Sequence, residues 1–402
     1  MLTQAEKLIQ FNMKILDCMM KLAVVTDTFY PYKGGSSKRY YEVMRRLVKF
    51  GVDVTVYTVR LKQEWKIEET IDNIHVKRTK QVLDKFITKD GLRSISQTLI
   101  YTSWIAQELL EDDYDIIELN QCPLLPPIIA HPIRMIKHKS LSITFHEVWH
   151  NYWHNYTKNI FISSLGIFLE NLTTRIPDKL VAVSWRTALR LSKCFNVDLG
   201  RIKLIPNGVN PEIFNENKDR DAREMRIIYV GKFFPHKRID LLIDAYQIIK
   251  LRYPKLRLCL IGDGPLRAYY MKYVKNKGIN NIEFLGEVKD ELLYQLLASS
   301  MIYVLPSVRE GQSITTLEAM AAGTPQIVVK APTTAAQDIV SKARSGLIVN
   351  PSPIEIAEAI KTLLFNETLW REFSVNGAKF ARRYTWDRIA KMYLEHYKSL
   401  VR

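Results

Sequence analysis

Hydrophobic runs alternate with amphipathic stretches along most of the chain. The run LAVVTD (22–27) is followed by a glycine-containing loop, a helical stretch that ends at Gly51, and a second run, VDVTVYTV (52–59). A strand, a loop, a helix and a strand in this order are the building block of a parallel sheet. Further strands, separated by helices, are predicted at 74–80, 114–120, 141–147, 179–184 and 202–209.

A second series of the same kind follows a polar segment, residues 210–224, which is rich in Asn and Asp and is predicted to be a linker. Strands are predicted at 226–232, 256–261, 281–286, 301–307 and 325–329, and helices at 239–253, 267–278, 291–300, 314–323, 352–365 and 386–400. Two series of alternating strands and helices predict an α/β fold with two doubly wound, Rossmann-like domains. Ligands then bind where the carboxyl ends of the strands meet, in the cleft between the domains.

These patterns also predict the domain boundaries. Residues 1–19 show no convincing signal peptide and form either a short amphipathic helix or an overlong start, since Met20 is a natural beginning. The remaining parts are an N-terminal domain (20–209), the linker (210–224), a C-terminal domain (225–385), and a C-terminal helix (386–402) expected to pack back on the N-terminal domain.

Composition excludes several classes of protein. The 402 residues are 47% apolar and 25% charged, with only 16 glycines and 16 prolines, which excludes a disordered or collagen-like chain. No apolar run reaches the roughly 18 residues that a membrane-spanning helix needs. The four cysteines are far apart and form no metal-binding spacing, so we expect free thiols and a cytoplasmic location: Cys18, Cys122, Cys194 and Cys259.

The net charge of +16 favours an anionic partner. Phosphorylated ligands, acidic membranes and nucleic acids all fit this charge, and charge alone does not choose among them.

The segment LPSVREGQSITTLEAMAAGTP (305–325) carries the most chemical information. A strand ends there, Ser313 can cap the following helix, and the positive end of that helix then faces the binding edge of the sheet, where a diphosphate fits. Gly311 would let a ligand approach the backbone closely. Glu310 before the helix can reach a sugar ring, and Glu318 inside it can accept hydrogen bonds from ribose hydroxyls.

This segment resembles the E-x7-E motif of retaining, nucleotide-sugar-dependent glycosyltransferases of the GT-B fold, family 4, with Glu310 and Glu318 as its two glutamates. The resemblance extends over nearly the whole chain from Met20. It includes the segments TDTFYPYKGG (26–35), IPNGVNPEIF (205–214), YVGKFFPHKRIDLLIDA (229–245), LIGDGP (260–265) and IEFLGEV (282–288).

The resemblance implies a hexosyltransferase that moves a sugar from a UDP- or GDP-linked donor to a glycan or lipid-linked acceptor, with retention and without a metal or other cofactor. It implies an acceptor-side N-terminal domain and a donor-binding C-terminal domain. The reaction centre is expected at Glu310, His146 and Lys237. The donor is expected to bind Gly34, Gly35, Lys232, Lys237, Glu310, Gly311, Ser313, Ile314, Thr315 and Glu318.

Three departures from the family pattern concern the donor. Lys232 stands where the family commonly has Arg, so a point charge replaces the planar guanidinium at the diphosphate. The loop KAPTTAAQDIV (330–340) lacks the glycine pair that is frequent there, and Gln312 stands where an aromatic residue is common. Because the last two are expected near the donor sugar or base, the identity of the sugar is not predicted.

Three histidines four residues apart, His146, His150 and His154, would line one face of a helix and could bind a metal. The alternative, which the resemblance favours, is that His146 contacts the transferred sugar while the other two lie toward the acceptor or the surface.

Three features suggest that the protein associates with the inner face of a membrane. The first is the amphipathic pattern of residues 1–19, and the second is a basic helix with Lys38, Arg39, Arg45, Arg46 and Lys49. The third is an aromatic loop with Trp149, Tyr152, Trp153 and Tyr156. The alternative is that the charges are solvated and the aromatic rings pack between the domains.

Two other functions compete with the transferase. A nucleotide-sugar epimerase can share the GT-B fold, although the E-x7-E segment favours a transferase. The positive charge also suggests a nucleic-acid-binding protein, but the sequence contains no recognised binding module and no basic strand surface interleaved with aromatic residues.

Overall fold

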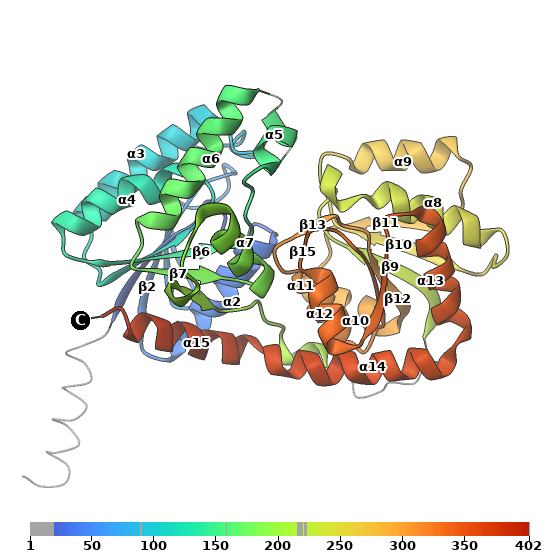
Figure 1. The fold of residues 1–402 in the computed structure, drawn as a ribbon. Helices are drawn as coiled ribbons and strands as arrows, with labels where there is room; N and C mark the ends of the chain where they lie inside the picture. Colours follow the sequence, from blue (N-terminus) through green and yellow to red (C-terminus); the bar gives the residue numbers. More distant parts are fainter. Residues whose placement is uncertain (1–19, 89–90, 158, 215–219, 221–222, 402) are drawn as a thin grey trace, which may run out of the picture.

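The computed structural model describes residues 20–88, 91–157, 159–214, 220 and 223–401, and the predicted segment 1–19 lies outside this part of the chain. Two α/β lobes stand side by side, each built on its own parallel sheet, and the last two helices run along the base of both (Figure 1).

The sheet of the N-terminal lobe has the strand order β3-β4-β2-β1-β5-β6-β7-β8, and all neighbours are parallel except β3 and β4. Its strands are β1 (Lys21–Val25), β2 (Asp53–Thr58), β3 (Glu68–Ile71), β4 (Ile74–Arg78), β5 (Ile116–Asn120), β6 (Ser140–Phe145), β7 (Lys179–Ala182) and β8 (Ile202–Leu204). Its helices are α2 (Gly35–Lys49), α3 (Ile95–Glu111), α4 (Leu125–Ile136), α5 (Tyr152–Thr157), α6 (Ile160–Arg175) and α7 (Trp185–Phe195). The central strands β5 and β6 are buried along nearly their whole length, including their polar residues, because helices cover both faces of the sheet.

The sheet of the C-terminal lobe is parallel throughout, with the order β11-β10-β9-β12-β14-β16. Its strands are β9 (Glu224–Val230), β10 (Arg257–Ile261), β11 (Ile282–Gly286), β12 (Ser300–Leu305), β14 (Gln326–Val329) and β16 (Gly346–Val349), and β13 (Arg309–Glu310) pairs separately with β15 (Thr333–Thr334). The helices are α8 (Ile239–Lys250), α9 (Arg267–Asn276), α10 (Asp290–Ser299), α11 (Ile314–Ala321), α12 (Ala336–Ala343), α13 (Pro353–Phe365), α14 (Glu367–Ala381) and α15 (Trp386–Lys398).

This architecture confirms the predicted fold of two doubly wound Rossmann-like domains. One predicted detail is wrong: β2 and β4 are joined by the antiparallel strand β3 and not by a helix. The predictions also missed α14, whose buried face includes Trp370 and Phe373.

The C-terminal helix α15 packs on α2 and on the core of the N-terminal lobe through Ile389, Tyr393 and Tyr397. Arg39 on α2 is fully buried there and donates hydrogen bonds to the Tyr393 hydroxyl (2.8 Å) and to the Ile205 carbonyl oxygen (2.7 Å). A buried guanidinium needs partners of this kind, because an unpaired one would cost several kcal/mol. Helix α15 therefore returns from the C-terminal lobe to the lobe that contains β1.

Candidate active site

A cleft of about 1650 Å³ lies between the two lobes. Its walls come from both: the loops after β1, β5 and β6 on one side, and the loops after β9, β10 and β12 on the other. These are the carboxyl ends of the strands, where doubly wound sheets bind their ligands.

The amino-terminal end of α11 forms part of the wall on the C-terminal side. The Ser313 hydroxyl caps the helix by accepting a hydrogen bond from the backbone N–H of Thr316 (3.2 Å), as the sequence predicted. The Thr315 hydroxyl is hydrogen-bonded to those of Tyr303 (2.7 Å) and Ser313 (3.1 Å), which fixes the first turn. Ile314 and Thr315 thus present a helix end with its positive dipole to the cleft.

Both predicted phosphate-binding lysines face carboxylates at the cleft wall. The Lys237 ammonium lies 2.5 Å from Glu310 Oε1, and the Lys232 ammonium lies 2.5 Å from Glu287 Oε1 and 5.1 Å from the centre of the Tyr32 ring. The structure therefore brings Glu310 and Lys237 together, although 73 residues separate them in the sequence.

Glu318 is nearly inaccessible, at 2% exposure, and its carboxylate pairs with Lys38 of the other lobe (2.7 Å). Lys38 also reaches Asp290 (2.9 Å). Burial disfavours the charged ammonium, but these two carboxylates outweigh burial and raise the pKa of Lys38. The pair joins the lobes at the point where the sequence predicts a ribose-binding carboxylate.

His146 directly follows β6 and lines the cleft on the N-terminal side. Burial, with a smaller contribution from the Arg39 cation, lowers the pKa of His146 to about 3, so the imidazole is neutral at physiological pH. Within the described part of the chain, its Nε2 atom is buried without a hydrogen-bond partner. A neutral imidazole with a free nitrogen can bind a sugar hydroxyl but cannot act as an acid.

The three glycines predicted at the donor site, Gly34, Gly35 and Gly311, all line the cleft, but the close approach at Gly311 has a different cause. A Cβ atom at Gly311 would lie 1.6 Å from the carbonyl oxygen of His146, so the close approach that needs glycine is made by the other lobe and not by a ligand. Gly34 forms the N-cap of α2 and is crowded by Tyr32, whereas a Cβ at Gly35 would meet no atom within 4 Å. Both line the cleft.

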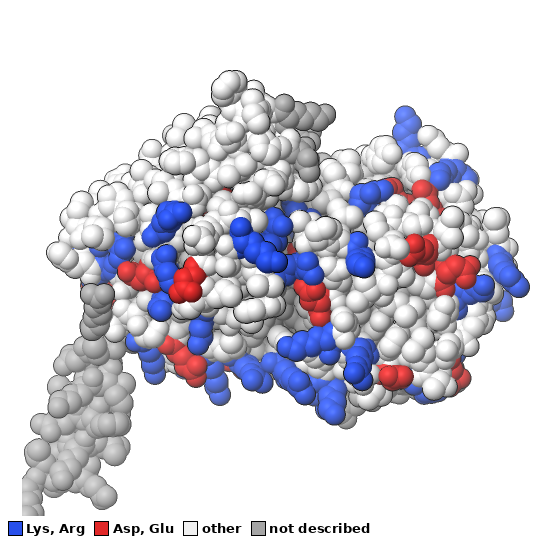
Figure 2. Space-filling model, viewed as in Figure 1, with Lys and Arg blue, Asp and Glu red and all other residues white. Residues whose placement is uncertain are grey.

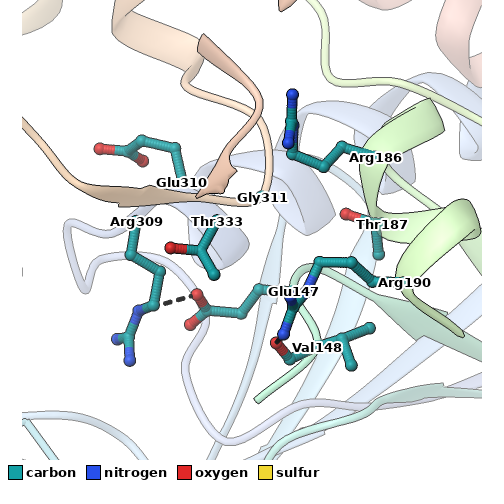
Figure 3. A pocket seen from close by; sticks show the side chains of 9 residues that line it. All are labelled: Glu147, Val148, Arg186, Thr187, Arg190, Arg309, Glu310, Gly311 and Thr333. Atoms are coloured by element: carbon teal, nitrogen blue, oxygen red, sulfur yellow. Dashed lines mark hydrogen bonds and ion pairs between the residues drawn. The ribbon is translucent and has the colours of Figure 1, made fainter. Parts of the chain in front are cut away.

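A second contact between the lobes surrounds a pocket of about 10 Å³, enough for one water at most (Figure 3). Arg309 of β13 pairs with Glu147 (3.0 Å), and its guanidinium lies 4.5 Å from the ring centres of Trp149 and Tyr152. Figure 3 shows that the Glu310 side chain leaves β13 in the opposite direction. Trp149 and Tyr152 therefore pack between the lobes, which agrees with the alternative to a membrane-facing aromatic loop.

The three histidines His146, His150 and His154 lie in different local structures. His146 follows a strand, His150 has a left-handed backbone (φ 42°), and His154 lies in α5, so the three histidines do not share one helix face. In the described part of the chain, no three His, Cys, Asp or Glu side chains are placed to hold a metal ion. The side chain of Tyr156 lies outside the described part.

The predicted basic surface on α2 is wrong for most of its residues. Arg39 is buried in the core, Lys38 pairs with Glu318, and Arg45 and Arg46 both pair with Glu42 of the same helix. Only Lys49 of this set is exposed. Helix α15 packs on α2, and most charges of α2 are paired or buried.

Sequence reasoning missed Glu170, a buried carboxylate on α6. It accepts hydrogen bonds from the backbone N–H groups of Trp149 and His150 (both 2.8 Å) and from the Trp153 indole (3.1 Å). Glu170 thereby fixes the loop that follows His146. The only sequence signal is a single acidic residue in an otherwise apolar helix, which marks a buried polar contact.

Two further residues, Asp27 beneath the cleft wall and Gln312 in it, make contacts that the sequence did not predict. Asp27 after β1 is buried and pairs with Arg93 (2.5 Å), and the Asn120 amide donates to it (3.3 Å). Gln312 accepts a hydrogen bond from the backbone N–H of Asn207 (2.5 Å), so the residue that departs from the family pattern joins the two lobes. The described cysteines, Cys122, Cys194 and Cys259, are free thiols.

Comparison with known proteins agrees with this geometry. Residues 33–213 match the family described as Glycosyltransferase Family 4, and residues 211–380 match Glycosyl transferases group 1. An uncharacterized glycosyltransferase of Methanocaldococcus jannaschii is 28% identical over 94% of this chain and 98% of its own. A phosphatidyl-myo-inositol mannosyltransferase of Mycobacterium leprae is 24% identical over 74% of this chain and 77% of its own.

Solved structures share the fold. Sucrose-phosphate synthase from Thermosynechococcus elongatus has a TM-score of 0.81 at 20% identity, covering 95% of this chain and 99% of its own. Anabaena HepE in complex with UDP-glucose has a TM-score of 0.72 at 18% identity, covering 95% and 100%. None of these findings favours the epimerase or the nucleic-acid-binding protein. The chain belongs to the group 1 glycosyltransferases of the GT-B fold.

Proposed function

We propose that the protein transfers a hexose from a UDP- or GDP-linked donor to a hydroxyl group of a glycan or lipid-linked acceptor, with retention of configuration. The observation that carries this proposal is the pairing of Glu310 with Lys237 at the cleft wall, beside the amino end of α11. The complex of HepE with UDP-glucose and the name of the mycobacterial mannosyltransferase support the donor and acceptor classes.

The diphosphate would lie between Lys232, Lys237 and the first turn of α11. These groups supply positive charge where negative charge develops as the nucleotide leaves, so the proposed reaction requires no metal. Lys237 lies within reach of both Glu310 and a phosphate, and can therefore fix the sugar relative to its leaving group. Glu318 would accept hydrogen bonds from the ribose hydroxyls once Lys38 moves aside.

The transfer itself needs no nucleophilic side chain. The acceptor oxygen forms its bond to the anomeric carbon on the face from which the diphosphate departs, and the carbon–oxygen bond to the diphosphate breaks. The acceptor proton passes to a phosphate oxygen of the leaving group. Glu310 and the neutral His146 would hold sugar hydroxyls from opposite sides of the cleft.

The domain assignment belongs to this proposal. Residues 20–209 would bind the acceptor and residues 225–385 the donor, with 210–224 as the linker and 386–402 returning to the acceptor side. We further propose a cytoplasmic protein that works at the inner face of the membrane.

The test is transfer with UDP- and GDP-linked sugars and with oligosaccharide and lipid-linked acceptors, followed by NMR assignment of the new linkage. The linkage should have the anomeric configuration of the donor. Glu310→Gln should lower turnover by roughly a hundredfold, because it weakens the positioning of the sugar. Glu358→Gln, an exposed site in the same lobe, is the matched control. An inverted linkage, or full turnover by Glu310→Gln, would contradict the proposal.

A further inference from the structure

One face of the N-terminal lobe is almost free of charge. Three helices cover it: α4 packs between α3 and α6. Residues 95–107, 125–133 and 160–169 of these helices contain no Asp, Glu, Lys or Arg, in a chain in which 25% of the residues are charged. Figure 2 shows the corresponding upper part of the lobe as mostly white.

Large apolar side chains on this face point into solvent, and we call them the apolar face. On α6, Phe161 is 83% exposed and Phe168 62%. On α3, Ile95 is 71% exposed and Leu99 53%. Soluble proteins rarely leave adjoining apolar side chains of this size uncovered unless the surface binds something.

The apolar face continues into the cleft. Ile95 of α3 and Ile162 and Leu165 of α6 are exposed at the surface and also line the cleft that contains His146 and Glu310. An apolar route therefore leads from the candidate active site to the outside of the protein.

The loop that carries His146 is attached to the same face. Trp153 packs so closely on α6 that a Cβ at Gly166 would lie 2.7 Å from its indole ring, and Glu170 of α6 binds the backbone after His146. The apolar face and the acceptor side of the cleft thus belong to one packed unit.

We propose that the apolar face docks on the surface of a lipid bilayer, so that the hydrocarbon part of a lipid-linked acceptor stays in the membrane while its head group enters the cleft. A bilayer fits better than a second copy of the chain, because a second copy seated over Ile95, Ile162 and Leu165 would cover this opening of the cleft. The choice of a lipid-linked acceptor rests on the proposed function, whereas the docking itself does not.

The docking differs from the electrostatic association that the sequence suggested. Most basic residues of α2 are already paired or buried, Lys38 with Glu318 of the other lobe and Arg45 and Arg46 with Glu42 of the same helix, and the apolar face carries almost no charge. Apolar side chains would enter the acyl boundary of the bilayer without a spanning segment, and none of the helices described is both long and apolar enough to cross a membrane.

The experiment is flotation of the full chain with vesicles of phosphatidylcholine alone and of phosphatidylcholine mixed with phosphatidylglycerol, at low and high salt and without donor. We expect binding to both kinds of vesicle that survives high salt. Phe161→Ser combined with Phe168→Ser should lower the partition coefficient by roughly tenfold or more. Leu251→Ser combined with Ile354→Ser, at sites of similar exposure (87% and 67%) in the other lobe, should float like the wild type.

Several results would overturn this proposal. One is flotation of the Phe161/Phe168 variant at the wild-type level, and another is wild-type binding only to anionic vesicles at low salt. A third is light scattering that shows a wild-type dimer converted to a monomer by the variant, with no vesicle binding in either.

Nucleotide titration of the same variant separates docking from the proposed function. Unchanged nucleotide affinity shows that the variant is folded. If the Phe161/Phe168 variant no longer floats with vesicles but still binds nucleotide, the result supports docking through the apolar face. If the wild type binds vesicles but no nucleotide, the docking proposal is supported and the proposed transferase activity is contradicted.

Discussion

The ion pair between Lys38 and Glu318 should couple the two lobes energetically. Glu318 is 2% exposed, so Lys38→Met would leave a buried carboxylate without its cation, which costs about 3 kcal/mol of unfolding free energy. Glu318→Gln should cost less, because a neutral amide can remain beside Lys38, which keeps Asp290 as a partner. In the double variant the two losses should not add, and we expect a coupling energy of about 2 kcal/mol.

The assay is urea unfolding of the wild type, both single variants and the double variant. The surface pair Lys21 and Asp113, with side chains 46% and 71% exposed, is the matched control and should couple far more weakly, because solvent screens it. Saturating nucleotide should reduce the coupling of the buried pair, since the ribose competes with Lys38 for Glu318. A coupling no larger than that of the surface pair would refute the reasoning.

Three more predictions follow from the site and the core. Lys237→Ala should weaken binding of UDP or GDP more than binding of the free nucleoside in calorimetry, and equal weakening would show that Lys237 does not face the diphosphate. Gly311→Ala should lower the melting temperature, because its Cβ would overlap the His146 carbonyl, whereas Gly35→Ala should melt like the wild type; equal melting would contradict this. Burial lowers the pKa of His396 from 6.5 to about 4, so its contribution to stability is complete above pH 6.5 and falls by roughly 1.4 kcal/mol per unit toward pH 4. His396→Asn should reduce the slope of that decline in urea unfolding without abolishing it, since buried His146 contributes the same pH dependence, and an unchanged slope would count against this origin.

Patterns of local sequence predicted the parts of the fold that depend on local physics. Runs such as LAVVTD and MIYVLPS correspond to β1 and β12, and Ser313 caps α11 as expected, because burial and capping act within a few residues. Helix α14 was missed because its sequence, ETLWREFSVNGAKFA, contains Asn and Gly on a mixed surface. Its apolar side chains are buried only once α11 lies against them.

Contacts between the lobes could not be predicted from the sequence. Nothing local indicates that Lys38 reaches Glu318 across 280 residues, or that Gly311 faces the backbone of His146. For the same reason α2 was interpreted as a basic surface, although its cations are used in packing. The apolar face was also missed, because the first ten residues of α6 read equally well as a buried helix.

The central claim is that the cleft binds a nucleoside diphosphate through Lys237 and Glu318. Calorimetric titration of the wild type, Lys237→Ala and Glu318→Gln with UDP and GDP tests it most directly, with Lys361→Ala as the exposed control. We predict that the wild type and the control bind one of the two nucleotides equally well, and that both cleft variants bind it at least roughly tenfold more weakly. Binding that is unchanged in both cleft variants, or a folded wild type that binds neither nucleotide, would contradict the account.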